Sequence, residues 1–412
     1  MEAETILLVV SILAGLYTAM NIGGNDVANA MGTSVGSKAL TFRQAIIVAA
    51  FFEFAGAVLV GSHVTQTIRK GIISPEHFAA TPELLVLGML SALLAAGFWL
   101  QISTYLGLPV STTHSIVGAV MGFGIVANGF GSVDWGKVTE IVISWIISPL
   151  AGAAIAYFVF RHVSKRILEA KNPMDEAVGR APYLAFFVFF ILILSFIYKG
   201  LKNLHLNLPL HTALLWAFGV SVLLSILVRF IMQRFSQVER DPIEFVENIF
   251  KYLQIMTACY VAFAHGANDV ANSIGPLSAI VHILKTHTVQ MQVEVPLWIL
   301  MLGGGGIVMG LAVWGYNVIR TIGGKITEIT PTRGFSAEFA TATTVLVFSK
   351  MGLPISTTHT LVGSVIGVGI ARGIAALDLR VIRDIVGSWI LTLPAAALMS
   401  VIIYQILLVI YF

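Results

Sequence analysis

The chain has 412 residues, of which 57% are hydrophobic and only 11% are charged. Soluble proteins carry about 25% charged residues, so this composition excludes a soluble globular protein and indicates a polytopic membrane protein. The net charge is only +3, and no basic patch is interleaved with aromatic residues, so nucleic acid is not an expected partner. The single cysteine, Cys259, excludes an intrachain disulfide and a multi-cysteine metal site.

The apolar segments predict an all-α protein with about 12 transmembrane segments, because about 20 apolar residues cross the hydrocarbon of a bilayer. The chain begins MEAETILLVV, without the basic region of a signal peptide, so we expect a retained first span. Residues 21–37 are rich in glycine and asparagine, and we expect a broken or re-entrant helix there. The other expected helices are 5–20, 43–61, 83–105, 112–127, 138–160, 181–198, 211–230, 297–317, 335–350, 357–371 and 383–412, and residues 264–275 repeat the pattern of 21–32.

Two segments of the first half recur in the second half. GLPVSTTHSIVGAVMGFG at 107–124 and GLPISTTHTLVGSVIGVG at 352–369 are identical at 12 of 18 positions. Residues 23–32 and 266–275 match at 7 of 10 positions. Such internal repeats are typical of transporters. We therefore expect a first transmembrane repeat, a central part of charged loops with two linking spans, and a second repeat, at residues 1–160, 161–250 and 251–412.

The central charged loops predict the orientation of the chain. Residues 161–180 contain five Lys or Arg and the segment from Arg229 to Lys251 contains four, whereas residues 199–211 contain only two, so the positive-inside rule places the charged loops 161–180 and 231–250 in the cytoplasm. Equivalent points of the two repeats are then about seven crossings apart, and an odd number makes the repeats face opposite ways. We therefore predict inverted repeats in the cell membrane, with both termini outside and a binding site at the repeat interface.

An aspartate beside an asparagine is the sharpest chemical signal in each repeat. An ionised carboxylate in a membrane segment is costly and points to function, although an Asp also caps short helices near a surface. A second asparagine follows three residues after each Asp, on the same helical face. Carboxylate and amide oxygens suit a hard cation such as Na⁺, which we expect at Asp26 and Asp269. The predicted sodium ligands are Asn25, Asp26, Asn29, Asn268, Asp269 and Asn272.

The repeated STTH segment predicts a helix N-terminus that follows a turn containing glycine and proline. The unpaired N–H groups there carry about half a positive charge and form an anion site. The alternative is a capped helix that packs through its glycines, but the duplication favours the anion site. The predicted anion ligands are Ser111, Thr112, Thr113, Ser356, Thr357 and Thr358, together with Asp26 and Asp269.

Two further acids lack an acidic counterpart in the other repeat. Glu53 lies in the middle of a span, and the position equivalent to Glu338 is Leu93. We assign both to coupling or gating, although Glu338 is also compatible with a first-turn acid that follows Ser336. The histidines that close the STTH runs are assigned to the same group, with simple hydrogen bonding as the alternative. The coupling or gating candidates are Glu53, Glu338, His114 and His359.

The charges of such a site require cations. An anion of charge −1 to −2 between two ionised aspartates gives about −3 to −4, and four helix N-termini return about +2. The four repeated segments contain no Lys or Arg. Cotransported cations are therefore expected and no other cofactor. The sequence holds no GxxxxGK[ST] loop and no triad-like nucleophile, so neither ATP-driven pumping nor an enzyme is predicted.

At these residues the chain resembles the inorganic phosphate transporter (PiT) family, through GGNDVANA at 23–30, GANDVANS at 266–273 and the two GLP[VI]STTH segments. The resemblance covers both halves and nearly the full length. It implies a phosphate symporter with inverted repeats, termini outside and a cytoplasmic central loop. It also implies essential aspartates at Asp26 and Asp269 and functional glutamates at Glu53 and Glu338. A further acid of some members has no match here, where Met89 lies in that region.

The coupling ion stays open between Na⁺ and H⁺. The duplicated amide and carboxylate oxygens favour about two Na⁺ per phosphate, whereas proton coupling would use Glu53, Glu338 or a histidine. Transport of metal–phosphate complexes, a sulfate permease, an anion channel and an intramembrane hydrolase are further alternatives, the last two of which leave the repeated motifs unexplained. The expected partners are inorganic phosphate, Na⁺ or H⁺ and the lipid bilayer, with a homodimer left open.

Overall fold

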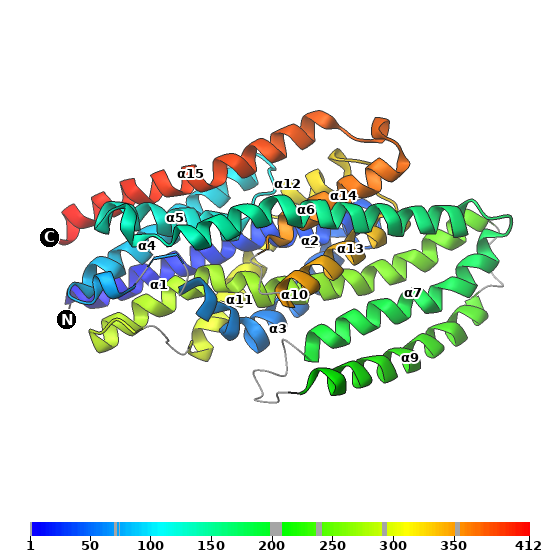
Figure 1. The fold of residues 1–412 in the computed structure, drawn as a ribbon, viewed down its shortest axis with the longest axis horizontal. Helices are drawn as coiled ribbons and strands as arrows, with labels where there is room; N and C mark the ends of the chain where they lie inside the picture. Colours follow the sequence, from blue (N-terminus) through cyan, green and yellow to red (C-terminus); the bar gives the residue numbers. More distant parts are fainter. Residues whose placement is uncertain are drawn as a thin grey trace.

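The computed structural model describes residues 2–69, 72–73, 75–197, 208–235, 241–290, 295–350 and 355–412. These residues form helices and no β-strand, with a single bridge between Ile73 and Val133, so the predicted all-α class is confirmed. The helices lie side by side along the long axis of the molecule, and both termini lie at one end (Figure 1). The long helices are α1 (Glu2–Ile22), α2 (Ala28–Gly36), α3 (Phe42–Arg69), α4 (Pro82–Tyr105), α5 (Thr112–Asn128), α6 (Trp135–Val163), α7 (Pro173–Ser195), α9 (Leu210–Phe235), α10 (Pro242–Thr286), α11 (Leu297–Trp314), α13 (Pro331–Lys350), α14 (Thr357–Arg372) and α15 (Leu379–Tyr411).

Shorter helical segments join or extend these helices. The π-helical segments are η1 (Gly23–Val27), η4 (Ser164–Leu168) and η6 (Thr321–Lys325). The 3₁₀ segments are η2 (Pro75–Phe78), η3 (Phe130–Ser132) and η7 (Ile374–Ala376), and α12 (Tyr316–Arg320) is a short α-helix.

Within the described residues, eight helical segments are long and apolar enough to cross a membrane. The α5 and α14 helices have 17 and 16 residues, which is less than the roughly 20 residues that a full crossing needs. These two helices carry the repeated STTH segments at their N-termini, so each repeat contains a short helix that starts at these hydroxyls.

The expected break at residues 21–37 was wrong. The chain runs without interruption from α1 through η1 into α2, and one apolar span covers Glu4–Gly36. The glycines of this stretch serve close packing instead, because a Cβ on Gly23 would lie 1.8 Å from the Ile307 carbonyl oxygen of α11. The equivalent segment of the second half, 264–275, lies inside the continuous helix α10. The glycines of both segments, 21–37 and 264–275, therefore indicate close contacts between helices.

Equivalent helices of the two halves pack crosswise. The α5 helix packs on α15, and its equivalent α14 packs on α6. Glycines make both contacts close: a Cβ on Gly118 would lie 2.5 Å from the Leu393 carbonyl oxygen, and one on Gly363 would lie 2.3 Å from that of Pro149. Each STTH helix therefore rests on the last helix of the opposite half, which brings both STTH helices into the middle of the molecule.

The central helices α7 and α9 form a separate layer. They pack on each other, and α7 also packs on α10, around a second apolar cluster that includes Val188, Phe245 and Phe250. The outer face of α9 exposes large apolar side chains such as Leu215 and Trp216, as expected for a helix that faces lipid. Parts of the two charged segments are helical, since α7 begins at Pro173 within the first segment and α10 begins at Pro242 within the second.

Candidate functional site

The two STTH segments begin helices, as predicted. The Ser111 hydroxyl accepts a hydrogen bond from the His114 backbone N–H at 3.3 Å and caps α5. The Ser356 hydroxyl accepts one from the His359 N–H at 3.2 Å and caps α14. Both caps are buried. Each therefore directs the positive end of a helix into the interior of the protein.

The first aspartate meets the STTH segment of the opposite half. Thr358 donates a hydrogen bond to Asp26 Oδ1. The Asn29 amide nitrogen donates to the same oxygen at 3.2 Å and to Thr358 Oγ1 at 3.1 Å. Only 2% of Asp26 is exposed, so its carboxylate relies on these polar groups.

The second aspartate has an equivalent asparagine beside it, but its threonine partner belongs to its own half. The Asn272 amide nitrogen donates to Asp269 Oδ1 at 3.3 Å, to Thr112 Oγ1 at 2.9 Å and to Thr113 Oγ1 at 3.3 Å. Thr357 donates to Asp269 Oδ2 at 3.2 Å. Asp269 is 5% exposed. The structure thus brings the two predicted aspartate motifs and the two predicted hydroxyl motifs into one buried site, with ligands exchanged between the halves.

The asparagines that follow each aspartate leave one polar atom free. Within the described part of the chain, Asn29 Oδ1 and Asn272 Oδ1 are buried and have no hydrogen-bond partner. Buried amide oxygens are rarely left in this state, because their desolvation is costly. Two unpaired amide oxygens beside two buried carboxylates fit the oxygen ligands of a hard cation.

Asn25 is held differently from Asn29. Its side-chain oxygen accepts from the Val110 N–H at 3.0 Å, and its nitrogen donates to Thr104 Oγ1 at 3.1 Å and to the Leu108 carbonyl at 3.0 Å. Asn25 therefore braces the turn that leads into α5. Asn268 lies beside Asp269 on α10 and is partly buried.

His265 is a site residue that the sequence reasoning missed. Its Nδ1 lies 3.0 Å from Glu53 Oε2, and its Nε2 lies 2.8 Å from Asp269 Oδ2 and 3.8 Å from Asp26 Oδ2. One ligand atom from each of Asp26, His265 and Asp269 lies within 4.8 Å of the others, which is close enough to hold an ion. His265 directly precedes GANDVANS, but its equivalent position holds Ile22, so a search for repeated residues overlooks it.

Glu338 forms a second polar cluster. Its carboxylate accepts hydrogen bonds from Thr33 at 2.6 Å, Ser34 at 2.8 Å, Gln254 at 3.1 Å and Thr257 at 2.6 Å. These donors come from α2 and α10, so Glu338 joins α13 to both helices. The alternative of a first-turn acid after Ser336 is excluded, because α13 already begins at Pro331 and Glu338 lies beyond its first turn.

His114 and His359 meet each other. Their rings are 4.7 Å apart between centroids, edge to face. His359 stacks on Trp389 at 3.7 Å, and His114 lies 4.2 Å from Trp145. The four rings join α5, α14, α6 and α15 directly behind the hydroxyl segments.

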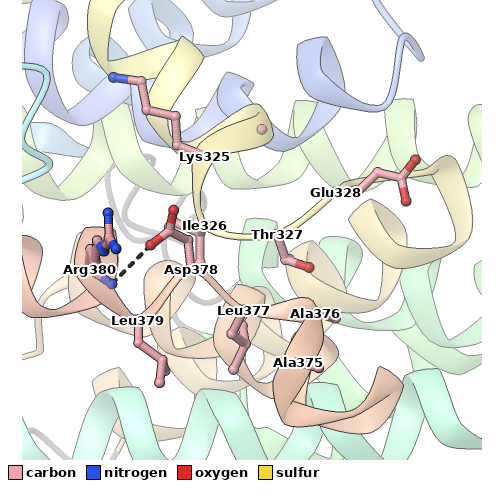
Figure 2. A pocket seen from close by; sticks show the side chains of 11 residues that line it. Lys325, Ile326, Thr327, Glu328, Ala375, Ala376, Leu377, Asp378, Leu379 and Arg380 are labelled. Atoms are coloured by element: carbon pink, nitrogen blue, oxygen red, sulfur yellow. Dashed lines mark hydrogen bonds between the residues drawn. The ribbon is translucent and has the colours of Figure 1, made fainter.

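A cavity of about 530 Å³ opens elsewhere, between η6 and the start of α15 (Figure 2). Residues 324–328 and 375–380 line it, and the Arg380 backbone N–H donates to Asp378 at its edge. At its rim, hydrogen bonding and charge from Arg333, with a further contribution from Arg372, lower the pKa of the Glu328 carboxyl. No predicted site residue lines this cavity, so it is separate from the site.

The chain is similar to known proteins over nearly its whole length. Residues 22–400 match the model of the phosphate transporter family. The chain is 46% identical over 404 residues to a Thermococcus kodakarensis protein whose name describes a phosphate permease, covering 98% of each chain. It is 44% identical to the inorganic phosphate transporter 2-1 of Arabidopsis thaliana, over 95% of this chain and 70% of that protein. A solved structure, named the sodium-dependent phosphate transporter, is 44% identical and superposes with a TM-score of 0.90 over 98% of this chain and 100% of that chain.

Proposed function

Because the chain belongs to the phosphate transporter family, we propose that it imports inorganic phosphate across the cell membrane by symport with sodium ions. Members of this family are transporters and not enzymes. Phosphate transport follows from the family, and sodium as the coupling ion is suggested by the name of the solved structure. The residues that carry each step are inferred from the geometry of the buried site.

The phosphate is expected between the N-termini of α5 and α14. The Ser111 and Ser356 oxygens accept backbone hydrogen bonds as caps, which leaves their O–H protons available to a phosphate oxygen. The adjoining hydroxyls Thr112, Thr113 and Thr357 lie beside them in the same buried region. Helix N-termini with hydroxyl donors suit a tetrahedral anion without a lysine or arginine.

One observation carries the proposal of sodium coupling: among the residues that the structure describes, Asn29 Oδ1 and Asn272 Oδ1 are both buried without a donor, each beside a carboxylate. Together with Asp26 and Asp269 they supply two equivalent sets of oxygen ligands. A bound Na⁺ at each set satisfies the amide oxygens and offsets the charge of phosphate beside the aspartates. Empty of cations, the same site repels the anion, and this repulsion makes uptake of phosphate depend on sodium.

The exchange of ligands between the halves suggests how binding is coupled to movement. Asn29 and Asp26 of the first half contact Thr358, whereas Asn272 of the second half contacts Thr112 and Thr113. A loaded site therefore links both halves of the protein. We assign gating roles to the contacts at their edges: Glu338, which joins α13 to α2 and α10, and the pair His114 and His359.

The direction of the helices supports inverted repeats. His287 Nε2, just after α10, lies 3.9 Å from Glu4 Oε1 at the start of α1, so the equivalent helices α1 and α10 run in opposite directions. Both termini lie at the end of the molecule opposite the connection between α6 and α7 (Figure 1). With residues 161–180 in the cytoplasm, both termini lie outside. Repeats at 1–160 and 251–412, joined by 161–250, complete about 12 segments when the short helices are included.

Uptake into proteoliposomes tests the proposed function. We expect saturable uptake of labelled phosphate under an inward sodium gradient at fixed pH, and loss of that uptake when choline replaces sodium. A protonophore should have little effect. A conductance for phosphate without sodium would instead indicate a channel, and sulfate uptake at a comparable rate would overturn the choice of anion.

A proton-coupled symporter is the second candidate, and the contact between Glu53 and His265 favours it. Both side chains are buried and able to carry a proton beside Asp269. Uptake that survives in choline and collapses with the protonophore would select this candidate over sodium coupling.

A further inference from the structure

The helix that supports each STTH helix carries the same pair of polar side chains. On α6, Ser148 follows Trp145 by three residues, and on α15, Thr392 follows Trp389 by the same spacing. Each tryptophan lies at the same sequence distance from the aspartate that caps its helix. The residue after each hydroxyl is also the one whose carbonyl faces a glycine of the neighbouring STTH helix. The two pairs are therefore equivalent in sequence and in space.

The two pairs differ in their hydrogen bonds. Trp389 Nε1 donates to the Pro109 carbonyl at 2.9 Å. Within the part of the chain that the structure describes, Trp145 Nε1 and Ser148 Oγ are buried and have no hydrogen-bond partner. The same indole N–H group therefore holds a turn of the chain at one of the two equivalent places and holds nothing at the other.

The indole bond completes the fixation of the turn before α5. Asn25 holds the residues on either side, because its side-chain oxygen accepts the Val110 N–H and its nitrogen donates to the Leu108 carbonyl. Pro109 lies between them, is buried and has no N–H, so its carbonyl is the one backbone group through which a hydrogen bond can hold it. Ser111, the cap of α5, follows two residues later. The indole therefore fixes the backbone that leads directly to the N-terminus of α5.

The same side chain contacts the other STTH segment. The Trp389 ring stacks on the His359 ring, with 3.7 Å between centroids and 18° between planes. His359 in turn donates its backbone N–H to Ser356, the cap of α14. Only 8% of Trp389 is exposed, so both contacts lie in the interior. One indole thus contacts the residues at the start of both helices between which the phosphate is placed.

We infer that Trp389 is a positioning residue for phosphate, which sets the N-termini of α5 and α14 relative to each other. This inference rests on the proposed function, in which phosphate lies between these N-termini. Donors bind an anion tightly when their geometry is fixed before it arrives, because no ordering cost is then paid on binding. The Trp145 ring contacts His114, with 4.2 Å between centroids, but its N–H has no acceptor among the described residues. The N–H of Trp389 therefore contributes to phosphate affinity, and that of Trp145 does not.

Trp389→Phe tests this role, because phenylalanine keeps an aromatic ring beside His359 and has no N–H. Sodium-driven uptake of labelled phosphate into proteoliposomes is measured over a range of phosphate concentrations at saturating sodium. We expect the half-saturating phosphate concentration to rise about fivefold, equivalent to about 1 kcal/mol, because the buried Pro109 carbonyl loses its donor. The maximal rate and the half-saturating sodium concentration should change less. A merely structural defect would instead lower the maximal rate, through the amount of active protein.

Two controls share the chemistry or the helix of this variant. Trp145→Phe makes the same chemical change at the equivalent position and should keep the wild-type half-saturating phosphate concentration. Thr392→Val lies on α15, where Thr392 Oγ1 accepts from Trp99 Nε1 of α4 at 3.0 Å and does not hold the turn. We expect Thr392→Val to lower the unfolding temperature without weakening phosphate affinity.

A second variant separates the shape of the side chain from its hydrogen bond. Site-specific replacement of Trp389 by 3-benzothienylalanine keeps the shape of the indole and puts sulfur in place of the N–H. We expect the same rise in the half-saturating phosphate concentration, and this variant decides the question if Trp389→Phe does not fold.

An unchanged half-saturating phosphate concentration in the benzothienylalanine variant, with sodium-dependent uptake intact, would overturn the inference and leave the proposed function standing. A rise in Trp145→Phe or Thr392→Val equal to that in Trp389→Phe would overturn it as well. A wild-type protein without sodium-dependent phosphate uptake would overturn the proposed function and this inference with it.

Discussion

The two copies of the aspartate motif share the contact between the Asp and the Asn three residues later, but they differ in backbone conformation. Residues 23–27 form the π-helical segment η1, whereas the equivalent residues lie within the regular helix α10. The contact of Asn29 with Asp26 is nevertheless 3.2 Å long, and that of Asn272 with Asp269 is 3.3 Å. In the first copy, Asp26 lies within the π turn and Asn29 lies just past it in α2, so the arrangement of ligands tolerates the change. π-helical turns frequently occur at functional sites.

The surroundings of the two copies differ more than the copies themselves. The second copy lies on α10 with Thr257 and His265 on the same helical face, where the first copy has Ala14 and Ile22. Glu338 has Leu93 as its counterpart, and His265 has Ile22. The comparison teaches that duplicated residues form the shared ligand sets and that the unduplicated polar residues gather along α10. The polar face of α10 consists of Gln254, Thr257, His265, Asp269 and Asn272.

The largest effect is expected from the aspartates, and it should be the same in both copies. Asp26→Asn and Asp269→Asn each remove a carboxylate ligand of a proposed cation site. We expect sodium-driven phosphate uptake to fall by about 100-fold or more, equivalent to about 2.7 kcal/mol. Glu83→Gln, at an exposed acid in the first turn of α4, is the control. Wild-type uptake in either well-folded aspartate variant would show that its copy is not used.

The second largest effect is expected at the close crossing of α3 and α10, where a substitution should lower the stability of the protein. Gly266→Ala places a methyl group against the Glu53 carbonyl oxygen of α3, and a backbone atom cannot move aside as a flexible side chain can. We expect a loss of about 1–3 kcal/mol in stability, as for other overpacked sites, seen as a lower unfolding temperature in detergent. Gly305→Ala is the matched control, because nothing lies within 4 Å of its added Cβ. Equal unfolding temperatures for the two variants would contradict the packing described here.

Glu338→Gln tests the unduplicated cluster. The charged oxygens accept four hydrogen bonds, and a hydrogen bond to a charged group contributes about 1.5–3 kcal/mol. The amide keeps one acceptor, so we expect uptake to fall by about tenfold, with a smaller change in the half-saturating phosphate concentration. Glu328→Gln, at an exposed acid of the rim, serves as the control. An uptake rate equal to that of the wild type would show that Glu338 has no role in gating.

The smallest effect is expected from the capping serines. Ser111→Ala and Ser356→Ala each remove a cap, which costs about 1 kcal/mol, together with one O–H donor for the anion. We expect apparent phosphate affinity to weaken by up to about tenfold in each variant, and sodium affinity to change less. An unchanged half-saturating phosphate concentration in both would show that these hydroxyls act only as caps.

The residues that could be predicted from the sequence are those that recur in both repeats. The spacing of STTH and of the aspartate motif placed the caps Ser111 and Ser356 and the buried pair Asp26 and Asp269, because each pattern appears twice. Which STTH segment meets which aspartate could not be predicted, because the crosswise packing of the halves decides it. The hydrogen bond from Thr358 to Asp26 is therefore known only from the structure.

The misses follow from tertiary contacts. Glycines at 21–37 suggested a break, but they allow α11 to approach an unbroken helix. Asn25 remains a predicted cation ligand, but its hydrogen bonds with Thr104, Leu108 and Val110 around the turn before α5 could not be predicted from its spacing. His265 escaped notice because Ile22 occupies its equivalent place, although an ionisable residue beside a membrane-embedded aspartate was itself a signal.

Counting ions against phosphate tests the two proposed cation sites most directly. Uptake of radioactive sodium and of labelled phosphate is measured in the same proteoliposomes at fixed pH, with the membrane potential clamped. Two equivalent sets of aspartate and asparagine oxygens predict about two sodium ions for each phosphate. Phosphate uptake that carries no sodium, and that a protonophore abolishes, would contradict sodium binding at Asp26 and Asp269.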